Sequence, residues 1–412
     1  MRYIISFMRK TKAVKNSIFK PGTDLFFLIG YGMYISLQII SSSFFSKEYD
    51  YGSIYFTGIA VSMLFVSLHY IFNYLLVDYK NVLQLIGLAA AVACVGILGT
   101  GEFYQNLVIH SLILIYLGRD VPFRKIAILT TIITVVLTTG IFLCSQIGII
   151  TDYVFRYEIR SERHGMGFIY ALYAPNYWFN ITALYLYVRE KRVHWFEWLV
   201  LFVINFYLYY MTDSRLAFAL SVVVIIVSAV MKFRPHLPEG KTLIHRFLVL
   251  LTPLYAIISL IVTLVYDDSI PWMSLINSKL GTRISLAQSA VNEFGINLTG
   301  KSINMVGTSA VEFGIYKPEE YNYIDNLYIQ FLITQGIILT IVILIMCTVS
   351  VYRAWKAGDY FSEIIFIIIA SHALLDDLVY KLHYNSFIIL GFILCYQFFK
   401  ENIGRDRNYI LH

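Results

Sequence analysis

IAILTTIITVVLTTGIFLCSQIG, residues 126–148, carries no charged side chain. A helix that crosses a bilayer needs about 20 mostly apolar residues, because the hydrocarbon core is about 30 Å thick. A soluble helix of this length would show a charged face towards water, and this segment has none. The segment therefore predicts a transmembrane helix.

Runs of the same kind recur along the chain and predict about twelve spans. Composition agrees, because 58% of the residues are hydrophobic and only 14% are charged, against roughly 25% charged residues in soluble domains. We expect an all-α, polytopic membrane helix bundle that forms a single integral membrane domain over residues 1–412. The expected spans lie near residues 24–45, 53–77, 82–98, 102–118, 126–148, 166–188, 196–212, 216–231, 247–266, 324–350, 362–378 and 386–399.

The distribution of positive charge predicts the orientation. Cytoplasmic loops of membrane proteins carry an excess of Lys and Arg. If residues 1–23 form a cytoplasmic tail, most of the 32 Lys and Arg residues fall in inner segments, and both termini are cytoplasmic. This topology accounts for the net charge of +6 without a nucleic-acid partner. The lipid bilayer is the partner that the composition requires.

Two outer segments are longer than a turn, namely an outer loop over 149–165 and a large outer loop over 267–323. In the second loop, Ile284, Ala287 and Val291 recur at helical spacing with polar residues between them. This pattern predicts an amphipathic helix lying in the membrane interface.

Arginines on the outer side are exceptions to the positive-inside bias and are therefore candidate binding residues. Several stand where a helix begins, so that backbone N–H groups and the positive end of the helix dipole lie beside them. Guanidinium groups at such positions favour anions, above all phosphate. The alternative is that they bind lipid head groups or pair with Glu158, Glu162 and Asp213. The candidates are Arg156, Arg160, Arg163, Arg215 and Arg283.

Acids and histidines near the outer face are candidates for proton transfer. His372 and Asp376 are four residues apart and share one helix face, where buried charge is costly and usually functional. A structural hydrogen bond between helices is the alternative. Asp325 opens a span, where it could instead cap the helix. His164 could accept a proton, because histidine titrates near neutrality, or could be an ordinary loop residue.

Motifs for metal, nucleotide or thiol chemistry are missing from the sequence. There is no GxxxxGK[ST], HExxH, CxxC or GxSxG. The four cysteines all lie in apolar runs, where they are typical of small buried hydrophobes. We therefore expect neither a metal nor a cofactor.

Four local motifs resemble those of one family. Asp213-Ser-Arg215-Leu-Ala-Phe opens a span, and Gly281-Thr-Arg283 precedes a helix followed by Gly300 and Gly307. The other two are Tyr323-Ile-Asp325-Asn326-Leu-Tyr328 with Gly336 shortly after, and Arg163 followed by Gly167-Phe168 and Pro175-Asn176. Together with the topology, these motifs resemble the O-antigen polymerase (Wzy-type) and O-antigen ligase superfamily of bacterial polysaccharide assembly. Asp325 stands where the ligases tend to have His, which favours a polymerase.

The resemblance implies a helical fold of the glycosyltransferase-C type in the cytoplasmic (inner) membrane. It implies a metal-independent glycosyltransferase that moves a growing glycan from undecaprenyl pyrophosphate to a hydroxyl of the next lipid-linked repeat unit, on the outer leaflet. A flippase and a chain-length regulator are the implied partner proteins.

The same resemblance assigns roles to residues. Arg215 and Arg283 are expected to stabilise the leaving pyrophosphate, with Arg163, Arg160 and Arg156 holding phosphate. Asp325 is the favoured base, followed by His164 and then the His372/Asp376 pair. Asn326 and Tyr328 belong to the same substrate-binding motif. Replacing either Arg215 or Arg283 with Ala is expected to abolish polymer.

Two other functions remain open at this stage. The first is a ligase of the same superfamily, which would pass the glycan to a different acceptor. The second is a lipid-linked oligosaccharide flippase, which would also have about twelve spans. Flippases of that kind carry repeated halves and a cationic central cavity, and no similar halves are visible in this sequence. A structural scaffold would leave the outer arginines unexplained.

Overall fold

The computed structural model describes residues 24–75, 82–98, 107–157 and 160–409. The expected cytoplasmic tail, 1–23, lies outside the described residues. The structure is about 75% helical with almost no sheet, and each of the expected spans contains a helix. In the first half, the helices are α2 (Asp24–Ser41), α3 (Phe45–Glu48), α4 (Gly52–Tyr70), η1 (Ile71–Leu75), α5 (Val82–Leu98), α6 (Leu107–Leu117), α7 (Phe123–Gln146), α8 (Tyr173–Arg189), η3 (Glu190–Arg192), α9 (Trp195–Thr212) and α10 (Arg215–Phe233).

The second half of the chain continues the bundle and adds short helices at one end. Its helices are α11 (Thr242–Val265), α12 (Pro271–Lys279), α13 (Arg283–Phe294), α14 (Thr308–Glu312), η4 (Pro318–Glu320), α15 (Leu327–Thr334), α16 (Gly336–Lys356), α17 (Tyr360–His372), η5 (Leu378–Tyr380) and α18 (Phe387–Tyr409). Six helical segments are long and apolar enough to cross a membrane: α2, α4 with η1, α7, α10, α11 and α16. The fold is thus an all-α membrane bundle.

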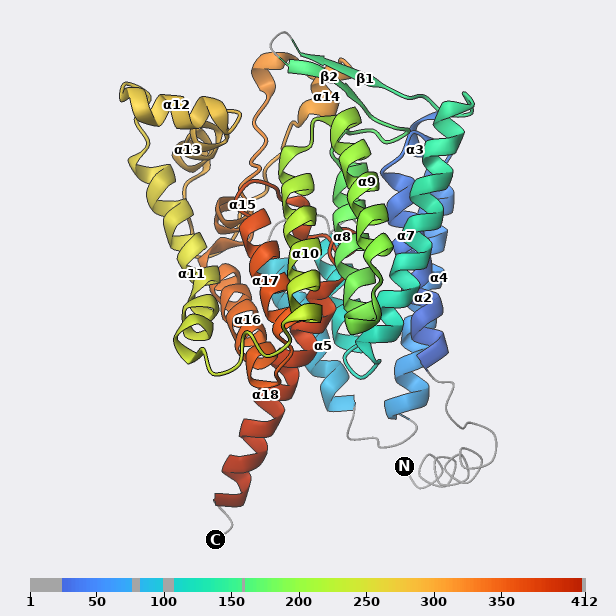
Figure 1. Ribbon diagram of the computed structural model, residues 1–412, viewed down its shortest axis with the longest axis vertical. Helices are drawn as coiled ribbons and strands as arrows, with labels where there is room; N and C mark the ends of the chain where they lie inside the picture. The colour runs from blue at the N-terminus through green and yellow to red at the C-terminus, as the bar shows by residue number, and fades with distance from the viewer. Residues whose placement is uncertain (1–23, 76–81, 99–106, 158–159, 410–412) are drawn as a thin grey trace.

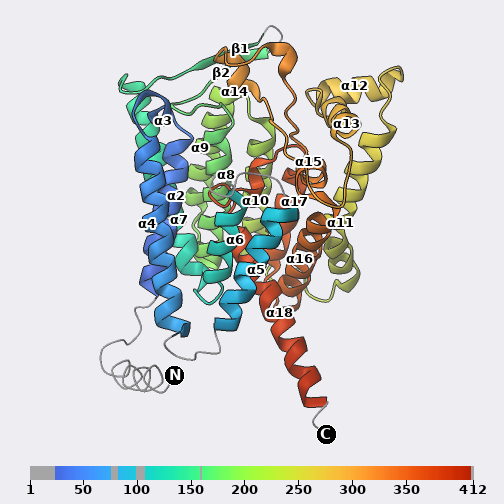
Figure 2. The same cartoon turned by 180° about the vertical axis from the view of Figure 1, so that it is seen from behind.

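The long helices run roughly side by side, and the two ends of the described chain lie at the same end of the bundle (Figure 1). At the opposite end, α12, α13, α14 and a small β-hairpin form a cap (Figures 1 and 2). We call this the capped end. The amphipathic stretch predicted to be an interfacial helix forms the helix α13, and its position at the membrane interface stays a prediction.

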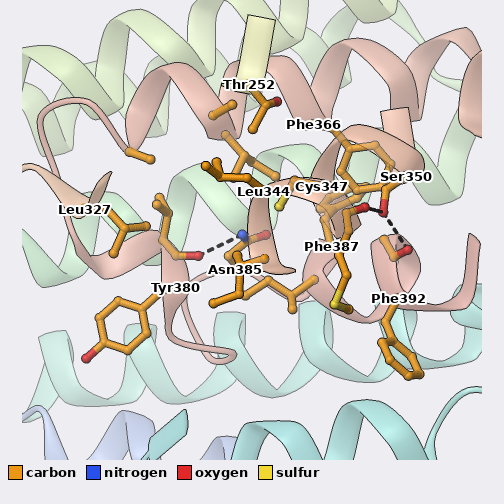
Figure 3. Close-up of a pocket in the computed structure, with 18 of the residues that line it drawn as sticks. Thr252, Leu327, Leu344, Cys347, Ser350, Phe366, Tyr380, Asn385, Phe387 and Phe392 are labelled. Carbon is orange, nitrogen blue, oxygen red and sulfur yellow. Dashed lines mark hydrogen bonds between the residues drawn. The ribbon is translucent and has the colours of Figure 1, made fainter. Parts of the chain in front are cut away.

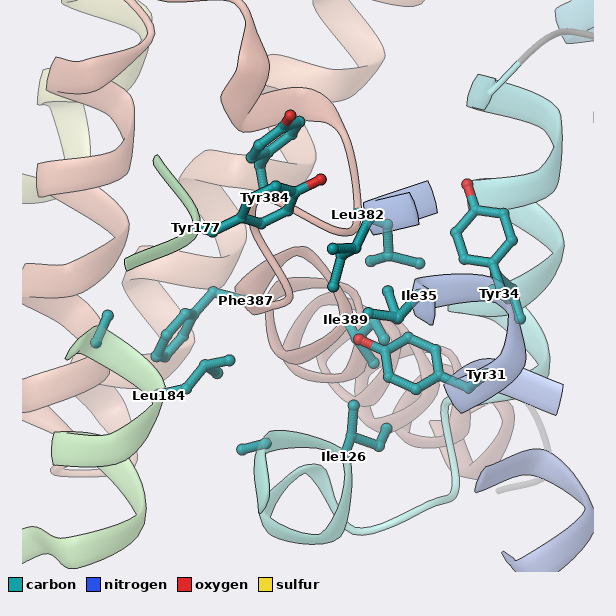
Figure 4. Close-up of a cluster of buried hydrophobic side chains, with 14 of the residues drawn as sticks. Tyr31, Tyr34, Ile35, Ile126, Tyr177, Leu184, Leu382, Tyr384, Phe387 and Ile389 are labelled. Atoms are coloured by element: carbon teal, nitrogen blue, oxygen red, sulfur yellow. The ribbon is translucent and has the colours of Figure 1, made fainter. Parts of the chain in front are cut away.

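Close helix contacts and buried aromatic rings hold the bundle together. At Gly30 in α2, a Cβ atom would lie 2.6 Å from the carbonyl oxygen of Ser62 in α4, so only glycine permits this approach. The core between α2, α7, α8 and α18 contains several tyrosines (Figure 4). Tyr31 is fully buried, and its hydroxyl contacts Thr130 and Ser386 at 3.0 and 3.1 Å. These bonds satisfy a polar group that burial would otherwise penalise.

The span expected over 324–350 is broken into two helices, α15 and α16. Gly336 has φ of +79°, a left-handed conformation that favours glycine and ends the first helix. The segment between α13 and α14 inserts at the break: Lys301 N–H donates to the Ile333 carbonyl, and Ile337 N–H donates to the Asn297 carbonyl. The break was not predicted from the sequence, because the run is apolar throughout and hydropathy does not report backbone hydrogen bonding.

The outer loop predicted over 149–165 contains a hairpin that the sequence did not predict. Strands β1 (Val154–Tyr157) and β2 (Arg160–His164) pair antiparallel, with Phe155 opposite Arg163. Asp152 stabilises the end of the hairpin, because its carboxylate accepts from Met166 N–H and contacts His164.

Candidate functional site

A polar cavity of about 190 Å³ lies under the capped end of the bundle. Its walls come from five separated segments: the entry to α8, the start of α13, the start of α14, the loop before α15, and the loop after α17. The side chains that give it its chemical character are Arg283, Asp325, Asp376, Asp377, Tyr170, Tyr173, Tyr321 and Tyr323. The structure thus brings together three predicted site residues: Arg283, Asp325 and Asp376.

Arg283 and Asp325 form an ion pair at this cavity, with 3.0 Å between Nε and Oδ2. Arg283 is the first residue of α13, and its Nη1 also donates to the Leu280 carbonyl. Asp325 does not cap α15, because the Asn326 side chain does so by accepting from Tyr328 and Ile329 N–H groups. The cap keeps Asp325 available to the cavity. Asn326, predicted to bind substrate, has its side chain committed to the cap and to Ser259.

Burial raises the pKa of the loop residue Asp325 to about 7, while the positive charge of Arg283 opposes the rise. Desolvation disfavours the charged carboxylate, and the neighbouring Asp376 and Asp377 add repulsion. A carboxyl group with a pKa near neutrality can exchange a proton under physiological conditions, which is the property expected of a general base.

Asp376 lies on the cavity wall with His372 behind it. Its carboxylate accepts from the Asn176 amide at 3.0 Å and from Leu378 N–H at 2.8 Å. His372 Nε2 lies 3.6 Å from Asp376 Oδ2, and its ring is fully buried against Phe179. The predicted pairing of these residues four positions apart is therefore seen, and only the acid reaches the cavity.

Asp377 and its partners were missed as site residues by the sequence analysis. The Tyr323 hydroxyl donates to the Asp377 carboxylate at 2.8 Å, and the Gln330 amide donates at 3.3 Å. Lys381 Nζ lies 4.0 Å from the same carboxylate. The sequence feature that could have identified Asp377 is the pair of adjacent acids, Asp376 and Asp377, at the end of an apolar run. Lys381 follows Asp377 at a spacing of four residues.

The structure does not bring Arg163 and Arg215 to this cavity. Both pair with Asp213, a residue in the left-handed conformation between α9 and α10. Arg163 is buried and lies 3.5 Å from the carboxylate of Asp213. Arg215 lies 3.0 Å from it, and its side chain is 77% exposed. One shared carboxylate thus pairs with two of the five arginines that were expected to hold phosphate. This is the alternative in which the arginines pair with acids.

The remaining predicted residues also lie away from the polar cavity. Arg156 is exposed and pairs with Glu162 at 3.1 Å. The Arg160 side chain is outside the part of the chain whose side chains the structure describes. His164 Nδ1 lies 3.1 Å from Asp152, in the hairpin. The Tyr328 hydroxyl donates to the Ala370 carbonyl, within the bundle.

The charge of the cavity limits what it can bind. Among its lining side chains, three carboxylates face a single guanidinium, and Lys381 stands beside Asp377. Carboxylates accept hydrogen bonds from hydroxyl groups, and tyrosines add ring faces and hydroxyls. Among the described residues, no group of three or more His, Cys, Asp or Glu side chains is placed to hold a metal ion.

Fold and site together define a polytopic, all-α membrane protein with an acidic, tyrosine-rich cavity under its capped end. Comparison with known proteins found no matching protein family, no similar curated protein and no similar solved structure.

Proposed function

We propose that this protein is a membrane glycosyltransferase that polymerises lipid-linked oligosaccharide repeat units. In this proposal the growing glycan leaves undecaprenyl pyrophosphate and joins a hydroxyl of the next lipid-linked unit, at the outer face of the cytoplasmic membrane. The proposal includes about twelve spans, two cytoplasmic termini and a glycosyltransferase-C type of fold. A flippase would supply the units, and a chain-length regulator is a further proposed partner.

The observation that carries the proposal is the Arg283–Asp325 pair in one cavity, 3.0 Å apart. In the proposed reaction, Asp325 takes the proton of the acceptor hydroxyl, whose oxygen forms a bond to the anomeric carbon of the donor sugar. The bond between that carbon and the diphosphate oxygen breaks, and its electron pair leaves with the diphosphate. Arg283 stabilises the negative charge that develops there.

The surrounding residues support a division of the cavity into two parts. A diphosphate is repelled by Asp376 and Asp377, so it belongs on the Arg283 side. The acids and tyrosines on the other side suit neutral sugar hydroxyls, which donate to carboxylates. Because Arg163 and Arg215 lie elsewhere, Arg283 is the arginine that we assign to the leaving group.

Deleting the gene in its source organism tests the proposal. We expect the ladder of glycan lengths to collapse to single repeat units, and the wild-type gene to restore it. A ligase would behave differently, because full-length polymer would still form on the lipid carrier but would not reach its final acceptor. An unchanged ladder in the deletion strain would rule out the polymerase.

The buried acids also favour a second candidate, a proton-coupled transporter of lipid-linked glycan. Asp376 and Asp377 are both less than 10% exposed and lie next to helices of a membrane bundle, where ionisable side chains often mark proton pathways. A transporter predicts that deletion traps lipid-linked units on the inner leaflet. A polymerase predicts that single units still reach the outer leaflet.

A further inference from the structure

A second cavity, of about 280 Å³, lies within the bundle and has apolar walls. It is lined by residues of α6, α11, α15, α16, α17, η5 and α18. Side chains such as Leu344, Cys347, Phe366 and Phe392 point into it (Figure 3). We call it the apolar cavity.

Two polar side chains on its wall donate to backbone carbonyls. The Ser350 hydroxyl donates to the Gly391 carbonyl, and the Asn385 amide donates to the Val379 carbonyl (Figure 3). These bonds leave mainly hydrocarbon facing the space. Such a cavity is a poor site for water, which needs several polar partners, and a good site for a hydrocarbon chain.

Two short segments separate the apolar cavity from the polar one. In the first, Asp325 lines the polar cavity, whereas Leu327 and Tyr328 line the apolar cavity. In the second, Asp376 and Asp377 face the polar side. Val379 and Tyr380, two and three residues beyond Asp377, line the apolar side. The two cavities are therefore adjacent. One suits polar or charged groups, and the other suits hydrocarbon.

We propose that the apolar cavity holds the part of a polyisoprenyl chain next to its diphosphate, with the diphosphate at Arg283. This inference rests on the proposed function and adds where the lipid carrier binds. Adjacent polar and apolar cavities suit a molecule with a charged head and a hydrocarbon tail. Since pockets for drug-sized ligands measure about 300–1,000 Å³, this smaller space fits one slender chain. A phospholipid would bring two chains from a single head group.

Photo-crosslinking of the full-length protein in phospholipid nanodiscs tests this site. The probe is a polyprenyl diphosphate with a diazirine on an isoprene unit near the diphosphate, and mass spectrometry locates the labelled peptides. We expect labels on the parts of α16 and α18 that line the apolar cavity. Unlabelled polyprenyl diphosphate should suppress this labelling in the wild-type protein, a result that needs no variant.

A matched pair of variants on α16 sharpens the test. Leu344→Trp places a large ring in the apolar cavity, whereas Ile345→Trp places it on the exposed side of the same helix. We expect Leu344→Trp to lower cavity labelling by about tenfold, because the added ring fills the space. Ile345→Trp should label like the wild type.

Three results would overturn the inference: labels confined to other helices, wild-type labelling of Leu344→Trp, or equal labelling of the cavity by a diazirine-bearing phospholipid. The last would mean that ordinary membrane lipid occupies it. A glycan-ladder assay on the same samples separates the two proposals. Cavity labelling without polymer formation by the wild type would reject the polymerase alone, and polymer formation without cavity labelling would reject this site alone.

Discussion

The Nε atom of Arg283 lies 3.0 Å from the Oδ2 atom of Asp325. The contact joins the start of α13 to the residue before the cap of α15, so that one ion pair connects these two helices. The two side chains are 25% and 17% exposed. At this depth each charge depends on the other, because an unpaired charge away from water is costly.

Arg283→Gln should reduce polymer formation by about 100-fold, because it removes the cation proposed to meet the leaving diphosphate. Arg215→Gln should retain polymer formation, since Arg215 is exposed and pairs with Asp213 outside the cavity. The sequence alone predicted the same loss for both arginines, and the structure separates them. Membrane fractions should be compared for glycan length at matched protein levels. An equal loss of polymer formation in both variants would contradict this assignment and would mean that Arg215 also takes part in the reaction.

The rate of transfer should fall as pH decreases through about 7. Burial raises the pKa of Asp325 to about 7. Only the carboxylate can act as a base, and at one pH unit below this pKa about a tenth of Asp325 is in the carboxylate form. The stability of the fold should depend on pH in the opposite sense. Because the folded-state pKa lies above the unfolded value of about 3.9, the contribution of Asp325 to the free energy of unfolding decreases as pH rises from about 4 to about 7.

Initial rates across this pH range, measured with purified protein, check the profile. Glu293→Gln is a suitable control, because Glu293 is an exposed acid on α13 and should leave the profile unchanged. A rate that does not change between pH 6 and pH 8 would show that Asp325 is not the titrating base.

Gly336→Ala should destabilise the protein by at least about 1–3 kcal/mol. Gly336 has φ of +79°, and a Cβ atom there would lie 2.5 Å from the carbonyl carbon of Thr299. Gly87→Ala is the control, because a Cβ atom at Gly87 meets nothing within 4 Å. Thermal unfolding in detergent should show a lower Tm for Gly336→Ala only. Matching Tm values would mean that the loop does not insert at the break between α15 and α16.

Asp213→Asn should lower stability more than it lowers specific activity. The substitution removes the carboxylate that Arg163 and Arg215 share, and Arg163 is buried. Losing one partner of a buried ion pair costs about 3–5 kcal/mol. Tm and activity per folded molecule should be measured together. Normal Tm with lost activity would place Asp213 in the reaction instead.

The helices were predictable from the sequence because hydropathy reports burial in lipid directly. Asp325 and Asp376 were also found, since charge at the end of an apolar run stands out. Arg283 was found as an arginine at the start of a predicted helix. The cavity's tyrosines were not found, because Tyr residues are abundant throughout the chain. The separation of Arg215 from Arg283 was not predictable either. It depends on Asp213 lying between Arg163 and Arg215, a packing relationship that spacing along the chain does not contain.

Purified protein mixed with a single lipid-linked repeat unit gives the most direct test of the central claim. We expect the wild type to convert the units into a ladder of longer glycans, and folded Asp325→Asn to make about 100-fold less. A normal ladder from Asp325→Asn, or no ladder from folded wild type supplied with its native lipid-linked unit, would contradict glycan transfer at the Arg283–Asp325 cavity.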